Sequence, residues 1–284
     1  MSAPILSLDR VSYAYPDSPL AVEDLRFSLE KGERVAVLGR NGAGKSTFFL
    51  LCCGILSPQR GTVSLQGRVL TGSKADRLEL HRRVGVVFQE AEDQILAVTV
   101  EGEVSFGPMN LRLPLPEVER RTAAALEAMS LSDYRQRQPQ FLSGGEKKRV
   151  TIADILAMEP DVILLDEPTA SLDPENVTRL EETLDQLTEA GIALMVSTHD
   201  VDFAARYARR GLVFSHSKLL EDGLLTEIFS RPDLLREAGL RKPSFWQAAE
   251  ALRPGLPSYP MTLEDFTAWA PKAPLEGSCQ PKAD

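Results

Sequence analysis

A glycine-rich segment near the N-terminus has the composition of a phosphate-binding loop. Residues 39–46 read Gly-Arg-Asn-Gly-Ala-Gly-Lys-Ser and match the pattern G-x-x-x-x-G-K-[ST]. Glycines let the backbone curl so that several N–H groups point at one anion, and the helix expected next presents its positive end. Lys45 supplies a cation for the β- and γ-phosphates, and the Ser46 hydroxyl suits Mg²⁺. The residues expected to hold the phosphates are Gly39, Asn41, Gly42, Gly44, Lys45, Ser46 and Thr47.

Two adjacent carboxylates close an apolar run further along the chain. Asp166 ends the run 162–165, and Glu167 follows directly. A carboxylate at a strand end beside a phosphate loop can hold Mg²⁺ through its water shell. Neighbouring side chains point in different directions, which makes Glu167 the candidate general base for an attacking water. The alternative, a strand end with two solvated acids, is the weaker interpretation downstream of a phosphate loop.

A second potential anion site lies at Ser143, Gly144 and Gly145, ahead of an expected helix over 146–158. One nucleotide cannot need two phosphate cradles on separate subdomains. We therefore expect this loop to serve the nucleotide of another subunit.

The elements that must position these groups alternate along the first 230 residues. Short β-branched runs indicate buried strands at 34–39, 84–89, 162–166, 192–198 and 211–214. A helical period follows Pro174 and stops before Gly191. Strands that alternate with helices favour a parallel α/β sheet. The stretch from about 90 to 158 breaks this rhythm, and we interpret it as a mostly helical insertion.

Composition sets limits on the function. The chain has 284 residues and a net charge of −9, so it is a poor candidate for non-specific nucleic-acid binding. It has neither the basic and apolar start of a signal peptide nor an apolar run long enough to span a bilayer. Three cysteines are too few for a disulfide framework, and we expect a reduced, cytosolic chain.

The charge distribution predicts a boundary near residue 230. Residues 231–284 hold seven basic and seven acidic side chains, so the whole −9 lies in 1–230. We expect 1–230 to form one nucleotide-binding domain and 231–284 a C-terminal extension with a frayed end. The aromatic side chains of the extension could pack back on that domain, bridge two copies or face a partner, and packing back is favoured. These side chains are Phe245, Trp246, Phe266 and Trp269.

Taken in order, the motifs from residue 5 to about 230 resemble an ABC transporter ATP-binding subunit. Leu-Ser-Gly-Gly-Glu at 142–146 is the segment that narrows the family. The resemblance implies an α/β P-loop NTPase with a mostly parallel core sheet, an N-terminal antiparallel β part, a helical signature subdomain and a short C-terminal extension. It also implies ATP and Mg²⁺ as cofactors, and two copies that share two ATP molecules.

The resemblance assigns roles to four further residues. Tyr15 matches the aromatic residue that stacks on adenine, although a strand-edge tyrosine is the plain alternative. Gln89 matches the glutamine that touches Mg²⁺ and the water, and it begins the segment that contacts the membrane subunit. Asp173 lies in the loop that crosses the dimer interface. His199 matches the histidine that contacts the γ-phosphate.

Finer details resemble energy-coupling-factor importers of the cobalt and nickel branch. The markers are segments 88–95, 104–111 and 152–158, with departures at Glu90-Ala91 and Asp154. This implies an ATPase subunit that forms a homodimer or a pseudo-symmetric dimer, binds integral membrane subunits at the cytoplasmic face of the membrane, and energises cobalt import. No cluster with metal-ligand spacing is present, so we expect the cargo to bind elsewhere.

Three alternatives stay open. Nickel or a vitamin could replace cobalt as the cargo. A soluble ATPase of DNA repair or translation is disfavoured, because only 98 positions separate Lys45 from Ser143 and the chain carries one ATPase unit. A regulatory binder without catalysis is disfavoured by Lys45, Asp166, Glu167 and His199.

Overall fold

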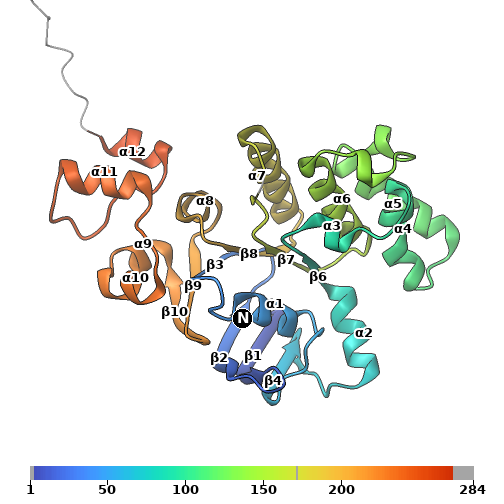
Figure 1. Ribbon diagram of the computed structural model, residues 1–284, viewed down its shortest axis with the longest axis horizontal. Coiled ribbons are helices and arrows are strands. Elements are labelled where there is room, and N and C mark those ends of the chain that lie inside the picture. Colours follow the sequence, from blue (N-terminus) through green and yellow to red (C-terminus); the bar gives the residue numbers. More distant parts are fainter. Residues whose placement is uncertain (1–2, 171, 271–284) are drawn as a thin grey trace, which may run out of the picture.

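The computed structural model describes residues 3–170 and 172–270, which form two sheets with helices around them (Figure 1). The first sheet is antiparallel and has the strand order β2-β1-β4-β5. Its strands are β1 (Leu6–Ala14), β2 (Leu20–Leu29), β4 (Arg60–Leu65) and β5 (Arg68–Val69). This sheet is the expected N-terminal antiparallel part.

The second sheet has the order β10-β9-β3-β8-β7-β6 and is parallel except for β10. Its strands are β3 (Arg34–Leu38), β6 (Val84–Val87), β7 (Val162–Asp166), β8 (Ala193–Thr198), β9 (Arg210–Ser215) and β10 (Lys218–Leu224). The expectation of a mostly parallel core sheet is confirmed. Because β3, β7 and β8 run in the same direction, their carboxyl ends meet at one edge, where such sheets bind ligands.

Both faces of the parallel sheet are buried, as its apolar runs require. Along β3, Val35 and Val37 join the core beneath the antiparallel sheet, whereas Ala36 and Leu38 join the core on the opposite face. Strand β7 alternates in the same way. Because each strand is buried on both faces, its position in the sheet is fixed. The points at which the loops leave the carboxyl ends of β3 and β7 are therefore fixed as well.

The helical insertion forms one side of the molecule, to the right in Figure 1. Its helices are α3 (Ala91–Gln94), α4 (Val100–Asn110), α5 (Leu115–Ala128) and α6 (Gly144–Ala157), with 3₁₀ turns η1 (Ser132–Tyr134) and η2 (Pro139–Phe141). The expected helix over 146–158 corresponds to α6, and α3, α4 and α5 confirm that the insertion is mostly helical. Helix α4 has no counterpart among the expected elements, and it contains Pro108.

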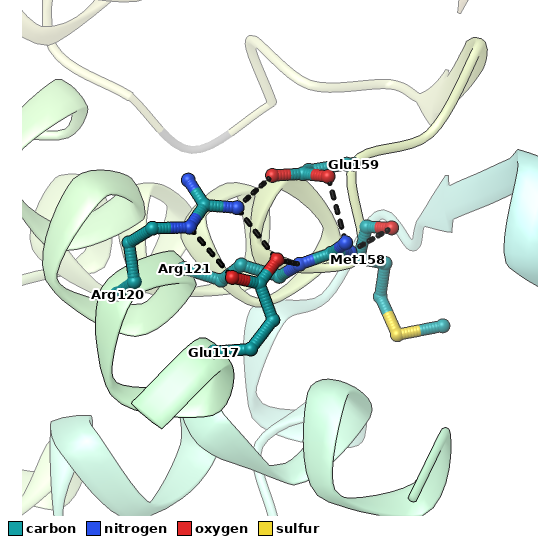
Figure 2. Close-up of polar contacts among 5 residues, drawn as sticks. All are labelled: Glu117, Arg120, Arg121, Met158 and Glu159. Carbon is teal, nitrogen blue, oxygen red and sulfur yellow. Dashed lines mark hydrogen bonds and ion pairs between the residues drawn. The ribbon is translucent and has the colours of Figure 1, made fainter. Parts of the chain in front are cut away.

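An ion-pair network ties α5 to the end of α6 (Figure 2). Glu117 accepts hydrogen bonds from Arg120 and Arg121, each at 2.7 Å, and both arginines also reach Glu159 at 2.8 Å. Arg121 also donates to the carbonyl of Met158, the C-cap residue of α6. The helix dipole favours a cation at this end of a helix. The network thus fixes α6 just before the chain enters β7.

The remaining helices flank the sheets. They are α1 (Lys45–Cys52), α2 (Lys74–Arg83), α7 (Pro174–Glu189), α8 (Val201–Tyr207), α9 (Leu225–Phe229), α10 (Pro232–Ala238), α11 (Ser244–Leu252) and α12 (Leu263–Trp269). As expected, aromatic side chains of the extension pack back on the domain. Trp246 is only 1% exposed and shares a buried core with α8, and Phe266 and Trp269 pack against that core. The frayed end expected beyond residue 270 lies outside the described residues. Among the described helices, none has the length and apolar character needed to span a membrane.

Candidate functional site

The phosphate loop connects the carboxyl end of β3 to α1. Gly44 caps α1 with φ at 107°, and a Cβ at this position would lie 2.5 Å from the carbonyl oxygen of Ala21. Only glycine fits both the left-handed backbone and this approach to β2. The first turn of α1 carries no acidic residue, so the helix places no carboxylate of its own beside its N-terminal N–H groups.

Lys45 folds back over this loop. Its side chain is buried, and Nζ donates to the carbonyl of Gly39 at 2.7 Å and to that of Arg40 at 3.1 Å. Burial lowers the pKa of Lys45, and the nearby carboxylates of Glu167 and Asp166 act in the opposite direction. The Lys45 ammonium group therefore contacts the backbone of the phosphate loop and lies near both carboxylates. In this position it can bind a phosphate group held by the loop.

Asp166 and Ser46 form an oxygen-rich corner at the end of β7. The Ser46 hydroxyl donates to Asp166 Oδ2 at 2.7 Å. Hard cations such as Mg²⁺ prefer oxygen donors of this kind and keep several water or phosphate ligands of their own. The described residues contain no group of three or more His, Cys, Asp or Glu side chains that could hold a metal alone. The donor set at this corner fits Mg²⁺ bound together with a nucleotide.

Glu167 has the geometry of an oriented base. Its φ is 43°, which is unusual for a residue other than glycine. Oε2 lies 2.9 Å from His199 Nδ1, and the backbone N–H donates to the carbonyl of Ser197 at 2.9 Å. The side chain is buried, and Oε1 has no hydrogen-bond partner among the described residues. An anchored carboxylate with one unpaired oxygen is suited to take a proton from water.

These groups surround one cavity of about 390 Å³. It is lined by Tyr15, Ala21, Asn41, Gly42, Gly44, Lys45, Ser46, Thr47, Gln89, Asp166 and Glu167. All of these except Ala21 are site residues expected from the sequence. Tyr15 is 39% exposed, its hydroxyl lies 3.3 Å from Thr47 Oγ1, and its ring lies at right angles to that of Tyr13. The cavity therefore offers a phosphate end and an aromatic end.

Several expected site residues lie outside the lining of this cavity: Gly39, Ser143, Gly144, Gly145, Asp173 and His199. Ser143 caps α6 through a capping box with Glu146, in which each residue accepts a hydrogen bond from the other's backbone N–H. Ser143 and Gly144 are exposed. Asp173 caps α7 and accepts hydrogen bonds from the backbone and side chain of Asn176, which lowers its pKa. Their predicted contact with a partner's nucleotide stays a prediction.

One residue beside the site escaped the sequence analysis. Lys148 of α6 is buried, and its Nζ donates to the carbonyls of Phe88 and Gln89 at 2.9 and 2.7 Å. Burial lowers the pKa of Lys148 to about 8. This lysine joins the helical insertion to the loop that carries Gln89. The sequence did contain a signal for its burial: Lys148 lies three residues after Gly145 and four before Ile152, so it is on the buried face of α6.

Known proteins share this architecture. The family model described as ABC transporter matches residues 22–170. The chain is 46% identical over 239 residues to the energy-coupling factor transporter ATP-binding protein EcfA of Methanothermobacter thermautotrophicus, covering 84% of this chain and 77% of that protein.

Solved structures agree. CbiO1 from Clostridium perfringens, described as part of the ABC transporter complex CbiONQ, superposes with a TM-score of 0.74 at 34% identity, covering 84% of this chain and 96% of that one. A dimeric ATP-binding cassette in a post-hydrolysis state with ADP and phosphate superposes with a TM-score of 0.68 at 26% identity, covering 78% of this chain and 98% of that one.

Proposed function

The chain belongs to the ABC transporter family as an ATP-hydrolysing subunit of the energy-coupling-factor type, and from that premise we propose that it energises import of cobalt. The observation that carries the ATPase part is the single cavity in which Lys45, Asp166 and Glu167 converge. The markers of the cobalt and nickel branch, and the similarity to CbiO1, support the metal cargo. Nickel or a vitamin is the alternative cargo.

In the proposed mechanism the chain first orients ATP. Tyr15 faces adenine, while the loop N–H groups and Lys45 hold the β- and γ-phosphates. Mg²⁺, when bound, neutralises phosphate charge, and we assign its protein ligands to Ser46, Gln89 and Asp166.

Glu167 then accepts a proton from the attacking water as the water oxygen bonds to the γ-phosphorus. The bond to the bridging oxygen breaks, leaving ADP and phosphate. His199 contributes in two ways: it anchors Glu167 through the 2.9 Å contact, and its largely exposed ring is available to the transferring phosphoryl group.

Two copies of the ATPase are required for a complete site in this proposal. Ser143 to Gly145 of one subunit would close over the nucleotide held by the other, since Ser143 and Gly144 are exposed and all three residues lie outside the lining of their own cavity. The similarity to a dimeric ATP-binding cassette bound to ADP and phosphate supports such a pairing. A homodimer and a pseudo-symmetric pair of related subunits both satisfy this geometry.

The membrane partner has a candidate docking surface next to Gln89. A groove of about 540 Å³ lies between the segment after Gln89 and the η2 turn. Its lining includes Ile95, Val98 and Pro139. Val98 is 74% exposed, and Leu96, which lies in sequence between the lining residues Ile95 and Ala97, is 79% exposed. Exposed apolar side chains beside a groove are typical of protein contacts, and Lys148 links this segment to the signature helix.

The ATPase part is tested with Glu167→Gln, which keeps the shape of the side chain and removes the base. We expect hydrolysis by the purified chain to fall at least about 100-fold, with ATP-dependent dimers accumulating in light scattering. Glu182→Gln, on the exposed side of α7, is the matched control and should behave as the wild type. Undiminished turnover of Glu167→Gln would remove Glu167 from the role of base.

The cargo is tested in cells that co-express the chain with its membrane subunits. Radiolabelled cobalt should accumulate with the wild type and not with Glu167→Gln. Accumulation of nickel or a labelled vitamin in place of cobalt would overturn the cargo assignment while leaving the ATPase part intact.

A further inference from the structure

The C-terminal helices touch the histidine loop of the nucleotide site. Asp202, in the first turn of α8, lies three residues after His199. The backbone N–H of Ser244, at the start of α11, donates to Asp202 Oδ1 at 2.6 Å, and the Ser244 hydroxyl donates to Oδ2 at 2.8 Å. Arg241 lies 3.5 Å from the same carboxylate. Bonds to an ionised acceptor are about twice as strong as neutral ones, so this contact joins α8 firmly to α11.

A second contact reaches the phosphate loop. Gly239 ends α10 with φ at 65°, and a Cβ there would lie 1.8 Å from Nε of Arg40. The Arg40 side chain thus lies directly on the turn between α10 and α11. The carbonyl of Arg40 accepts the hydrogen bond from Lys45 described above. The same part of the extension therefore borders two loops that hold the nucleotide site.

The extension is anchored rigidly enough to transmit position. Trp246 of α11 is 1% exposed and packs edge-on against Tyr259 at a centroid distance of 5.4 Å. Both belong to the same buried core as Phe203 and Tyr207 of α8. Close-packed cores resist displacement, so this shared core holds α11 in place against the rest of the domain.

His199 depends on the start of α8 for its place. Its side chain is 73% exposed, and its hydrogen bond to Glu167 is a contact across two loops. Asp200 caps α8 by accepting from the N–H groups of Asp202 and Phe203. The backbone on which His199 stands is thereby fixed by this cap on one side and by the Ser244 contact on the other.

We infer that Asp202 and Ser244 form a latch through which the C-terminal helices position His199 against Glu167 for ATP hydrolysis. The latch residues are positioning residues, because they act through His199 and do not reach the cavity. The inference rests on the proposed roles of Glu167 and His199. It assigns the extension a function in the ATPase site itself.

The test uses Asp202→Asn and Ser244→Ala in the purified full-length chain. Each should lower kcat for ATP about tenfold, because a small misplacement of a catalytic group is costly, while KM stays near the wild-type value and Tm falls only slightly. Asp233→Asn, which removes a fully exposed carboxylate of the same extension, is the matched control and should leave kcat unchanged. A rise in KM or a large fall in Tm with kcat unchanged would overturn the latch.

The decisive arm repeats both substitutions in a His199→Ala background. If the latch acts through His199, then Asp202→Asn and Ser244→Ala should not lower kcat further in the His199→Ala background. Equal losses of kcat in the wild-type and His199→Ala backgrounds would overturn the latch and leave the proposed roles of Glu167 and His199 intact. If His199→Ala by itself leaves hydrolysis unchanged, the proposed role of His199 falls, and the latch falls with it.

Discussion

The carboxyl group of Asp154 should make the stability of the helical insertion depend on pH. Asp154 lies on α6 opposite Glu103 of α4, which is 4% exposed and accepts hydrogen bonds from the N–H groups of Leu96 and Ala97. Burial, and next the negative charge of Glu103, raise the pKa of Asp154 to about 7, while a hydrogen bond from Gln94 opposes the rise. The unfolded chain has the ordinary value of 3.8.

The sign of the effect follows from proton binding. Between pH 4 and pH 7 the folded state binds the proton of Asp154 more tightly than the unfolded state does, so the free energy of unfolding falls as pH rises through this window. Each pKa unit is worth about 1.4 kcal/mol, which gives an upper bound of about 4 kcal/mol lost by pH 7. Asp154→Asn mimics the protonated form and escapes this loss.

Urea denaturation at pH 5, 6, 7 and 8 measures the difference between Asp154→Asn and the wild type. The advantage of the variant should grow by at most about 1.4 kcal/mol per unit from pH 5 to pH 7 and then level off. Asp133→Asn, an exposed carboxylate of the same subdomain, should run parallel to the wild type. Parallel curves for Asp154→Asn as well would show that Asp154 is ionised in the folded protein and would refute the reasoning.

Three further changes test separate parts of the site and fold. Tyr15→Ala should weaken ATP binding about tenfold in a fluorescent-nucleotide titration, because stacking on a base is worth about 1–3 kcal/mol, and equal affinities would remove Tyr15 from the adenine site. Asp166→Asn should raise the Mg²⁺ concentration for half-maximal hydrolysis about tenfold or more, and an unchanged titration would place the ion elsewhere. Trp246→Ala should lower the free energy of unfolding by about 3–5 kcal/mol in urea, and a loss below 1 kcal/mol would contradict the buried packing of the extension.

The sequence predicted the elements whose signals are local. The strand ending at Leu38 and the helix beginning at Lys45 were readable, because an apolar run, a glycine turn and a helix start follow one another without interruption. The convergence of Asp166 with Ser46 was also predictable, since parallel strands bring their carboxyl ends to one edge. Strand β7 was predictable as well, because a strand buried on both faces appears in the sequence as a continuous apolar run.

Elements without a periodic apolar signal were missed. Helix α2 buries only Asp76 and Leu80, so no apolar stripe marks it. Helix α4 contains Pro108, whose missing N–H and fixed ring normally end a helix, and the tertiary contacts of Val100 and Val104 override that preference. In both cases the chain is helical because of what it packs against, and a single sequence does not display that partner.

Contacts between distant segments were beyond the sequence for a different reason. Lys148 and Gln89 are 59 positions apart, and Asp202 and Ser244 are 42 apart. Nothing in the local pattern of either segment specifies the other. Such pairs are set by the docking of whole helices on the sheet. The predicted division at residue 230 shows the same limit, because the neutral composition of the extension marks a change in chain character yet does not reveal that Trp246 shares a core with α8.

Net charge illustrates why local geometry decides the ligand. The chain carries −9, and Asp166 and Glu167 add negative charge at the cavity itself, yet the ligand is an anion. At physiological salt the field of an exposed charge is screened within about 8 Å, so most surface carboxylates have little influence on the cavity. Within that distance stand Lys45 and the N-terminal turn of α1, free of acids, and a bound cation would offset Asp166. The electrostatic potential at the γ-phosphate is therefore set by a few groups that β3 and β7 position. The net charge of the chain has little influence on it.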